Sequence, residues 1–400
     1  MQHQSVFALI FVLLAFAGCT TQQVHRMANH DLIIRNLVLY EAYHEYCGWP
    51  SMARAANGDL LVTFTRTDEH LYPNGAAVLI RSEDNGKTWS PPQTILDTSV
   101  DERQFGLTTL RDGRIIGHLW SSHFTKEFYL SLSDTSLTPE ERARFIQYVE
   151  QPEYKSAANL QGSRLCISGD AGRTWSEPMP GPESTHGGIQ LADGSLLVAS
   201  YRGHGGHIGV HKTPAPEQPW QQVATIYCPE PDSFRFAEPH VLQLPSNRII
   251  MMIRFTKIVY NDKNPRYHLW ETYSDDNGLT WATPFETPLW GYPPHLMLLS
   301  DGRVLCTYGH RRPPYGQRAC ISKDGITWNP ADEIVIRDDA PNRDLGYPTS
   351  IELEPGIVLT VFYQVNLPYG KQPIDPPDPK RKKPDILGTV WRVPDKLSEE

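Results

Sequence analysis

A short unit of two apolar stretches joined by a tight turn recurs six times along this chain of 400 residues. Two apolar stretches around a turn rich in Gly, Asn or Asp are typical of an antiparallel hairpin. Successive turns are 53 to 55 residues apart, apart from one interval of 81 residues. A repeat of about 50 residues built from strands indicates similar sheets arranged in a ring. The turns lie at Asn57-Gly58, Asp112-Gly113, Asp193-Gly194, Ser246-Asn247, Asp301-Gly302 and Pro355-Gly356.

A second motif, S-x-D-x-G-x-T-W, interleaves with the hairpins. Copies of this Asp box begin at Ser82, Ser168 and Ser274, and a shortened copy begins at Ser322. The Asp can accept hydrogen bonds from its own turn, the Gly permits a positive φ, and the Trp can pack between sheets. The motif is therefore structural, and its aspartates receive no chemical role. The third unit keeps only a remnant near Trp220.

Together the two repeats predict an all-β fold over residues 31–400, a six-bladed β-propeller of four-stranded antiparallel blades. The stretch Leu32–Tyr40 is an additional strand that we expect to complete the last blade and close the ring. Insertions are predicted near 125–155 and 366–384. The first contains a capping box that starts at Thr138 and predicts a helix near 139–150. The second contains the basic run 380–383, which we interpret as a solvated loop.

The first 18 residues resemble a lipoprotein signal peptide. Val6 to Gly18 is apolar, too short to span a membrane comfortably, and is followed by Cys19. We therefore predict lipidation of Cys19, a tether over 19–30, and a location in the bacterial cell envelope, at the outer membrane or cell surface. Membrane contact would occur through the lipid anchor only. A plain secretory signal, with release of the protein, is the alternative.

Composition limits the classes of partner. The formal net charge of −9 argues against nucleic acid as a partner. No phosphate-binding loop, dinucleotide motif or ligand-spaced His/Cys cluster is present, so we predict neither a metal nor another cofactor. The five remaining cysteines are odd in number and form no C-x-x-C pair, which favours buried free thiols. They are Cys47, Cys166, Cys228, Cys306 and Cys320.

The repeat also selects the residues that should face the ring axis. These are the residues where the first strand of each unit begins and the second strand ends, because inner strands of a propeller converge on the axis. They are Arg, His, Glu, Tyr and Trp, which predict a pocket for a polar ligand such as a sugar. The starts hold Gly48-Trp49, Arg103-Gln104, His186, Glu238, Pro294-His295 and Tyr347, and the ends hold Arg66, Leu119-Trp120, Tyr201-Arg202, Arg254, Gly309-His310 and Tyr363-Gln364.

With Asp boxes on a six-fold β repeat, the chain resembles the sialidase (neuraminidase) superfamily. In that family a glutamate begins a hairpin and an arginine ends it, as Glu238 and Arg254 do here. The resemblance implies that Tyr347 is the nucleophile and Glu238 its base, and that Arg254 and Arg318 bind a substrate carboxylate. It implies a glycoside hydrolase that acts on a terminal acidic sugar of glycans.

The sequence departs from the family at the first blade. Gly48 stands where the family has the first arginine of a triad, and Arg66 matches another family arginine near the site. We expect Arg103 to replace the missing one. The acid/base residue should lie in Asp68-Glu69-His70, with Asp68 as the first choice. The remaining expected substrate-binding residues are His70, His186, His295 and His310.

Two alternatives remain open at this point. One is a polysaccharide lyase, or a non-sialidase glycosidase, acting on uronate-containing glycans, because histidine and tyrosine can abstract a proton beside a carboxylate. The other is a propeller that binds glycans without catalysis.

Overall fold

The computed structural model describes residues 31–41, 44–131, 138–258, 266–366 and 383–398. Cys19, the signal and tether segments, and residues 380–382 of the basic run lie outside the described residues. Within the described part, no helix is long and apolar enough to cross a membrane.

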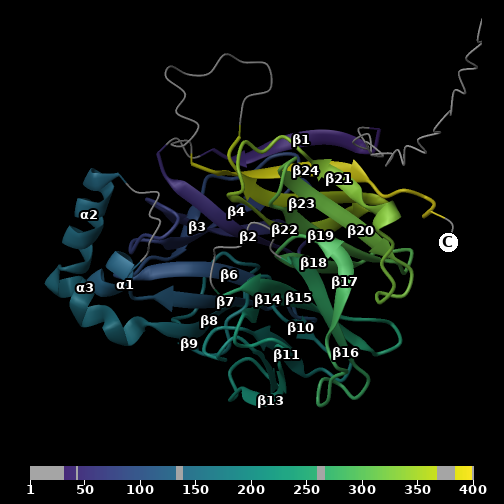
Figure 1. The fold of residues 1–400 in the computed structure, drawn as a ribbon, viewed down its shortest axis with the longest axis horizontal. Coiled ribbons are helices and arrows are strands. Elements are labelled where there is room, and N and C mark those ends of the chain that lie inside the picture. The colour runs from purple at the N-terminus through teal and green to yellow at the C-terminus, as the bar shows by residue number, and fades with distance from the viewer. Residues whose placement is uncertain (1–30, 42–43, 132–137, 259–265, 367–382, 399–400) are drawn as a thin grey trace, which may run out of the picture.

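Six antiparallel four-stranded sheets are arranged as the blades of a propeller, which confirms the predicted fold (Figure 1). The first strands of neighbouring blades contact one another around the axis. The first three blades consist of β2 (Tyr46–Arg54), β3 (Leu60–Thr67), β4 (Ala76–Ser82) and β5 (Gln93–Leu96); β6 (Asp101–Thr109), β7 (Ile115–Ser122), β8 (Gly162–Ser168) and β9 (Met179–Pro180); and β10 (Ile189–Gln190), β11 (Leu196–Ser200), β12 (Ile208–Thr213) and β13 (Gln221–Ile226).

The other three blades follow the same order, and the last one includes the N-terminal strand. They consist of β14 (Phe234–Gln243), β15 (Ile249–Lys257), β16 (His268–Ser274) and β17 (Phe285–Trp290); β18 (Pro294–Leu298), β19 (Val304–His310), β20 (Gly316–Ser322) and β21 (Ile334–Arg337); and β22 (Leu345–Glu354), β23 (Ile357–Gln364), β24 (Asp385–Arg392) and β1 (Ile33–Tyr40). β1 pairs antiparallel with β24, as predicted, and so closes the ring.

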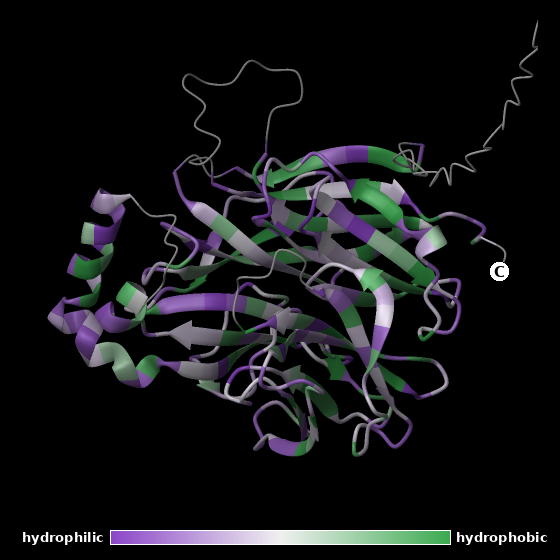
Figure 2. Cartoon of the chain, in the orientation of Figure 1, coloured by the Kyte–Doolittle hydropathy of each residue, from purple (hydrophilic) through white to green (hydrophobic). Residues whose placement is uncertain are grey.

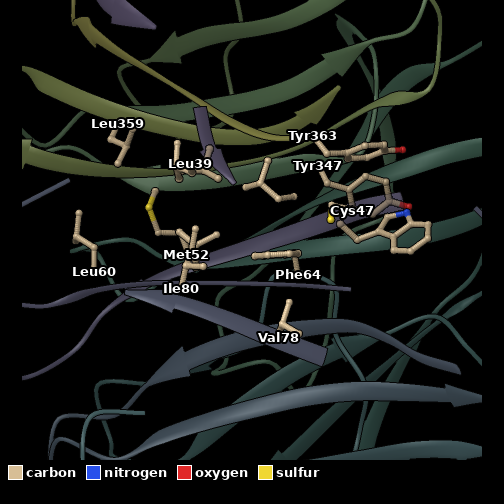
Figure 3. Close-up of a cluster of buried hydrophobic side chains, with 14 of the residues drawn as sticks. Leu39, Cys47, Met52, Leu60, Phe64, Val78, Ile80, Tyr347, Leu359 and Tyr363 are labelled. Carbon is tan, nitrogen blue, oxygen red and sulfur yellow. The ribbon is translucent and has the colours of Figure 1, made fainter. Parts of the chain in front are cut away.

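The core lies between the blades. Inner strands such as β15, with Ile249–Ile253 all buried, are apolar on both faces because a neighbouring blade covers each face. Figure 2 shows hydrophobic segments, coloured green, along many of the strands. One cluster joins blades 1 and 6, and in Figure 3 Leu60 and Leu359 lie at one end of it and Tyr347 and Tyr363 at the other. Each large aliphatic side chain buried there contributes about 1.5–3 kcal/mol.

The S-x-D-x-G-x-T-W turns are held by their own side chains. Asp84 Oδ1 accepts hydrogen bonds from the backbone N–H of Lys87 (3.0 Å) and Thr88 (2.9 Å), and Gly86 adopts φ +84°. The same carboxylate contacts recur at Asp170, Asp276 and Asp324. The four motif tryptophans pack against the clusters between blades. All five described cysteines are buried and none is in a disulfide with another described cysteine, as predicted.

The helical insertion lies between β7 and β8, beside the second blade (Figure 1). It contains α1 (Lys126–Ser131), α2 (Pro139–Val149), α3 (Pro152–Ser156) and the 3₁₀ turn η1 (Ala157–Leu160); a second 3₁₀ turn, η2 (Pro330–Asp332), lies in blade 5. The predicted helix is present as α2, with its capping box between Thr138 and Glu141. Phe145 and Tyr154 anchor the insertion in a small apolar cluster of its own.

Candidate active site

A cavity of about 550 Å³ opens at the centre of the ring, and each of the six blades contributes at least one side chain to its wall. In blade order, one such set is Trp49, Gln104, Arg202, Glu238, Arg311 and Tyr347. The four residues of this set that lie on first strands are among those that the repeat predicted to face the ring axis.

Four of these side chains reach the cavity through the same backbone device. Trp49, Gln104, Glu238 and Tyr347 have φ between 45° and 58°, a region that bulky residues rarely adopt. At each of the four, the pairing between the first and second strands of the blade is interrupted for two residues. Such a bulge redirects a side chain out of the regular alternation. In this fold it turns the four side chains into one cavity.

Tyr347 and Glu238 form the centre of the site. The Tyr347 hydroxyl donates a hydrogen bond of 2.5 Å to Glu238 Oε1, and Arg254 donates to Glu238 Oε2 at 2.6 Å. Burial and the Glu238 charge raise the pKa of Tyr347 well above its ordinary value, so the phenol is protonated. Burial alone would raise the pKa of Glu238 too, but Arg254 and the hydrogen bond from Tyr347 hold it below its usual value. A protonated phenol therefore faces an ionised carboxylate that can accept its proton.

A second polar side chain, Gln104, contacts the Tyr347 hydroxyl and is itself held by Tyr201. Gln104 Nε2 donates to the Tyr347 hydroxyl at 3.3 Å, and Tyr201 donates to Gln104 Oε1 at 3.0 Å. Buried Glu183 accepts from the backbone N–H groups of Tyr201 and Arg202, both at 2.9 Å. This chain of contacts orients the Gln104 amide, which in turn leaves one direction for the phenol proton, toward Glu238.

Arginines surround the cavity, and three of them have a buried Nε without a partner among the described residues. Arg254 and Arg311 lie over the Tyr292 ring, with guanidinium carbons 4.2 and 4.9 Å from its centroid. Arg202 stacks on Trp120, 5.1 Å from that ring centroid. The three unpartnered Nε atoms belong to Arg202, Arg254 and Arg311. The guanidinium groups in the wall give the cavity positive charge, which suits an anionic group.

Arg103 lines the cavity, as expected, but is already engaged. Its Nε pairs with buried Asp101 (2.7 Å), its terminal nitrogen donates to the His70 carbonyl (2.9 Å), and its guanidinium carbon lies 4.2 Å from the Trp49 ring centroid. The space of the missing first-blade arginine is filled, since a Cβ added at Gly48 would lie 2.8 Å from the Tyr46 ring.

The structure does not bring Arg318 to the cavity, which corrects its predicted place. Arg318 lies in β20, the third strand of its blade, and its guanidinium donates to the carbonyls of Gln317 (3.0 Å) and Pro314 (3.2 Å). Arg311, just after β19, lines the cavity instead. Arg66 is also outside the cavity wall: it pairs with Cys47 in the ladder and its side chain lies 3.5 Å from Glu45. Arg66 is one residue beyond the position that would face the axis, and one step reverses the face of a strand.

The loop after β3 presents His70 to the cavity and not Asp68 or Glu69. The Asp68 carbonyl accepts from Lys383 Nζ at 2.6 Å, and Glu69 forms an ion pair with the same Nζ at 2.7 Å. Lys383, from the basic run, therefore stabilises this loop and is not freely solvated.

Three of the predicted histidines do not line the cavity. His186 and His295 are buried near the axis with His240, at ring separations of 4.4 to 5.6 Å. Burial lowers the pKa of all three, to about 3 for His240, so they are neutral. The Nδ1–H of His310 donates to the Pro314 carbonyl in its own loop (2.9 Å). Among the described residues, no group of three or more His, Cys, Asp or Glu is placed to hold a metal ion.

Sequence reasoning gave Gln104, Arg202 and Arg311 no role, although the first two were among the axis-facing positions. The signal for Gln104 is its place at the strand start equivalent to Trp49, Glu238 and Tyr347. Arg311 lies one residue past the expected strand end at His310, so a uniform repeat length overlooks it.

Comparison with known proteins agrees with this architecture. Residues 140–359, more than half of the chain, match the model of the BNR repeat-like domain family. A search of curated protein sequences finds no match. Among solved structures, a protein of unknown function from Dyadobacter fermentans is similar at 22% identity and TM-score 0.69, over 90% of this chain and 99% of that one.

Two enzymes share the fold at lower identity. The NanB sialidase of Streptococcus pneumoniae, as its K499G mutant, aligns with TM-score 0.61 and 12% identity over 89% of this chain and 70% of that one. An α-L-arabinanase of Penicillium chrysogenum aligns with TM-score 0.59 and 14% identity over 91% and 99%. With six blades, four repeated Asp turns and a matching family model, the chain belongs to the BNR repeat-like domain family and has the propeller fold of the sialidases.

Proposed function

We propose that the protein is a glycoside hydrolase that removes a terminal acidic sugar from glycans. The observation that carries this proposal is the contact of the Tyr347 hydroxyl with Glu238 at 2.5 Å, with Arg254 on the other carboxylate oxygen at 2.6 Å. Glu238 accepts the phenol proton while the Tyr347 oxygen attacks the anomeric carbon. A neutral nucleophile avoids repulsion from an anionic sugar, and sialidases are the known tyrosine exception among glycosidases.

The anionic group of the sugar would bind Arg254 and Arg311, whose side chains line the cavity beside Tyr347. Both guanidinium groups remain charged: although burial opposes the charge, Glu238 raises the pKa of Arg254 and neighbouring tyrosines raise that of Arg311. The identity of the sugar is open between sialic acid and a related acidic sugar, because Gly48 and Tyr46 occupy the place of one family arginine.

The test is hydrolysis of aryl glycosides of sialic acid and of uronic acids, with products identified by mass. Tyr347→Phe should lower kcat/KM by about 10³-fold or more. Tyr308→Phe is the matched control, since this buried tyrosine donates to Glu333 outside the cavity. Undiminished turnover by Tyr347→Phe would overturn the mechanism. An unsaturated, UV-absorbing product would identify a lyase, and binding without turnover a glycan-binding propeller.

We also propose that the protein is exported and anchored through Cys19. The support is the apolar stretch Val6 to Gly18 that ends at this cysteine. Cells expressing Cys19→Ala should release the protein from the membrane fraction, whereas an unchanged distribution would argue against the anchor.

A further inference from the structure

The proposed reaction needs a second proton-transferring group, and the cavity offers few candidates. Breaking a glycosidic bond leaves an oxygen that must be protonated. Glu238 is the one carboxylate that lines the cavity among the described residues, and Tyr347 and Arg254 already engage it. Neither Asp68 nor Glu69 is in the cavity wall: Glu69 forms an ion pair with Lys383, and the backbone carbonyl of Asp68 accepts a hydrogen bond from the same lysine. The remaining group of this kind in the wall is His70.

His70 is oriented by groups from two different blades. Its Nδ1 lies 2.6 Å from the Tyr46 hydroxyl and 3.3 Å from Asp344 Oδ1. The Tyr46 hydroxyl donates its own proton to Asp344 at 2.9 Å, so its oxygen accepts from Nδ1–H. Nδ1 therefore carries a proton, and Nε2 is the nitrogen left for a ligand. The side chain is 42% exposed, which keeps it open to the cavity.

Asp344 is suited to support an imidazolium. Burial opposes its charge, but His70, Arg311 and the hydrogen bond from Tyr46 lower its pKa to about 2. It also accepts from the Tyr363 hydroxyl at 3.1 Å. The carboxylate is thus ionised at neutral pH, fixed by two tyrosines, and within ion-pair distance of the histidine. In hydrolytic triads, too, a carboxylate fixes the tautomer of a histidine and stabilises the imidazolium that forms.

The histidine and the nucleophile both contact one aromatic ring in the cavity wall. The Trp49 ring meets His70 edge-on at a centroid distance of 5.2 Å and Tyr347 edge-on at 6.5 Å. A sugar that rests against Trp49 in this cavity therefore lies near both the Tyr347 side chain and the imidazole. Nucleophilic attack with departure of a protonated alcohol requires both groups close to the same sugar.

We propose that His70 is the general acid-base catalyst, positioned by Asp344 and Tyr46. The inference rests on the proposed glycosidase function. In the first step the Tyr347 oxygen bonds to the anomeric carbon and its proton passes to Glu238. The glycosidic C–O bond breaks, its electron pair stays on the leaving oxygen, and that oxygen takes the proton from His70 Nε2.

In the second step a water molecule attacks the intermediate. His70 takes a proton from the attacking water, whose oxygen bonds to the anomeric carbon as the bond to Tyr347 breaks. Glu238 returns its proton to the Tyr347 oxygen. The products are the free sugar and the alcohol, and both His70 and Glu238 recover their starting protonation.

The decisive experiment compares two leaving groups. An aryl leaving group departs without protonation, whereas an alkyl alcohol does not, so loss of a general acid affects mainly the alkyl glycoside. We expect His70→Gln to lower kcat/KM by about 10²–10⁴-fold on the alkyl glycoside and by less than about tenfold on the aryl glycoside. His123→Gln is the matched control, because this histidine stacks on Tyr154 outside the cavity.

Asp344→Asn tests the positioning role. It should show the same dependence on the leaving group, to a smaller extent, because the imidazole is no longer oriented by a carboxylate. The other charged or titratable groups that face this histidine are Tyr46, Asp101 and Arg103, with Arg311 acting through Asp344.

The outcomes separate the two proposals. If wild type is active and Tyr347→Phe is not, equal losses on both substrates in His70→Gln, or no loss, would overturn the acid-base role alone. If wild type hydrolyses neither glycoside, or Tyr347→Phe remains fully active, the glycosidase proposal falls and the role of His70 falls with it.

Discussion

Individual side chains at the site are directed by strained backbone. Non-glycine residues with positive φ fall into two groups of four in the described chain: four lie in turns, and Trp49, Gln104, Glu238 and Tyr347 line the cavity. Three of the latter precede proline, although a residue before proline prefers an extended conformation. Strain of about 1–3 kcal/mol at each such residue persists only where the surroundings enforce it. The blades on either side supply that enforcement.

Substitutions of Arg311 and Arg318, the two arginines of blade 5 discussed above, should affect different quantities, the first substrate binding and the second thermal stability. Arg311→Gln removes a cavity donor and should lower kcat/KM for the acidic glycoside by about 10–100-fold, with little change in Tm. Arg318→Gln removes donors to the Pro314 and Gln317 carbonyls and should lower Tm while the folded protein keeps its kcat/KM. Parallel measurement of both quantities on both variants checks this. A binding defect in Arg318→Gln with unchanged Tm would contradict the assignment.

Buried Glu271 makes stability fall as pH rises. Burial raises its pKa to about 9, even though Trp328 Nε1 donates to it at 2.8 Å. The unfolded chain releases this proton near pH 4.5, so the folded state loses up to about 1.4 kcal/mol per pH unit between that pH and 9. Glu271→Gln keeps the acceptor for Trp328 and cannot ionise.

We therefore expect Glu271→Gln to raise the urea midpoint at pH 8 and to have little effect at pH 4.5. Glu354→Gln, at an exposed residue, should change neither midpoint. Equal midpoints for Glu271→Gln and wild type at pH 8 would show that the carboxyl ionises in the folded state without penalty.

The part of the site that sequence could predict is the part set by the repeat. Tyr347, Glu238 and Arg254 occupy equivalent strand ends, and periodicity alone places such ends together. Arg66 was misplaced because one residue of register reverses the side of a strand, and a turn-to-turn count does not resolve one residue. Arg318 was predicted from the resemblance alone, and its guanidinium is bound by nearby carbonyls. The choice among Asp68, Glu69 and His70 depends on Lys383, which approaches from more than 300 residues away. Such long-range contacts leave no local pattern.

At the scale of elements, the blades are made by hairpins and fastened by the Asp turns. Each such turn satisfies several backbone N–H groups with one carboxylate and one serine hydroxyl, so the loop needs no help from other elements. Because each of these turns is stabilised by its own residues, the turns leave a local pattern in the sequence, and this pattern predicted both the fold class and the number of blades. The insertion α1–α3 was readable for a similar reason, since the capping box at Thr138 is local.

Adjacent aspartates in the third Asp turn offer a matched test. Asp276 accepts from the backbone N–H of Leu279 (3.1 Å) and Thr280 (2.8 Å), whereas Asp275 forms an exposed ion pair with Arg248. Asp276→Ala should lower Tm by several degrees and Asp275→Ala by about one degree or less. Equal effects would mean that the turn does not depend on its carboxylate.

The same turn predicts a sign for acid unfolding. Hydrogen bonds from Thr280 lower the pKa of Asp276 to about 2, below its unfolded value. The stabilisation is present above about pH 4 and is lost as pH falls toward 2. The Tm difference between wild type and Asp276→Ala should therefore narrow across this window in a pH series.

At the scale of the whole molecule, the cavity exists only in a closed ring, because every blade supplies part of its wall. Closure depends on the pairing of β1 with β24, where the Thr389 hydroxyl donates to Asn36 Oδ1 at 2.8 Å. A disulfide at this pair would close a very long loop and restrict the unfolded chain.

The double variant Asn36→Cys/Thr389→Cys should, when oxidised, be stabilised by up to about 5 kcal/mol. The gain should disappear with reductant, and the single variant Asn36→Cys should show none. Guanidinium unfolding with and without reductant measures it. An oxidised variant no more stable than its reduced form would indicate that separation of β1 from β24 is not part of unfolding.

The pairing of β1 with β24 also determines when the last blade can form during synthesis of the chain. Ile33 is translated early, yet its partner Trp391 follows more than 350 residues later. At 5–20 residues per second, the early strand waits roughly 20–70 s for its neighbour. The first five blades can form before β24 is synthesised, but the sixth cannot, so the ring and its cavity are completed last.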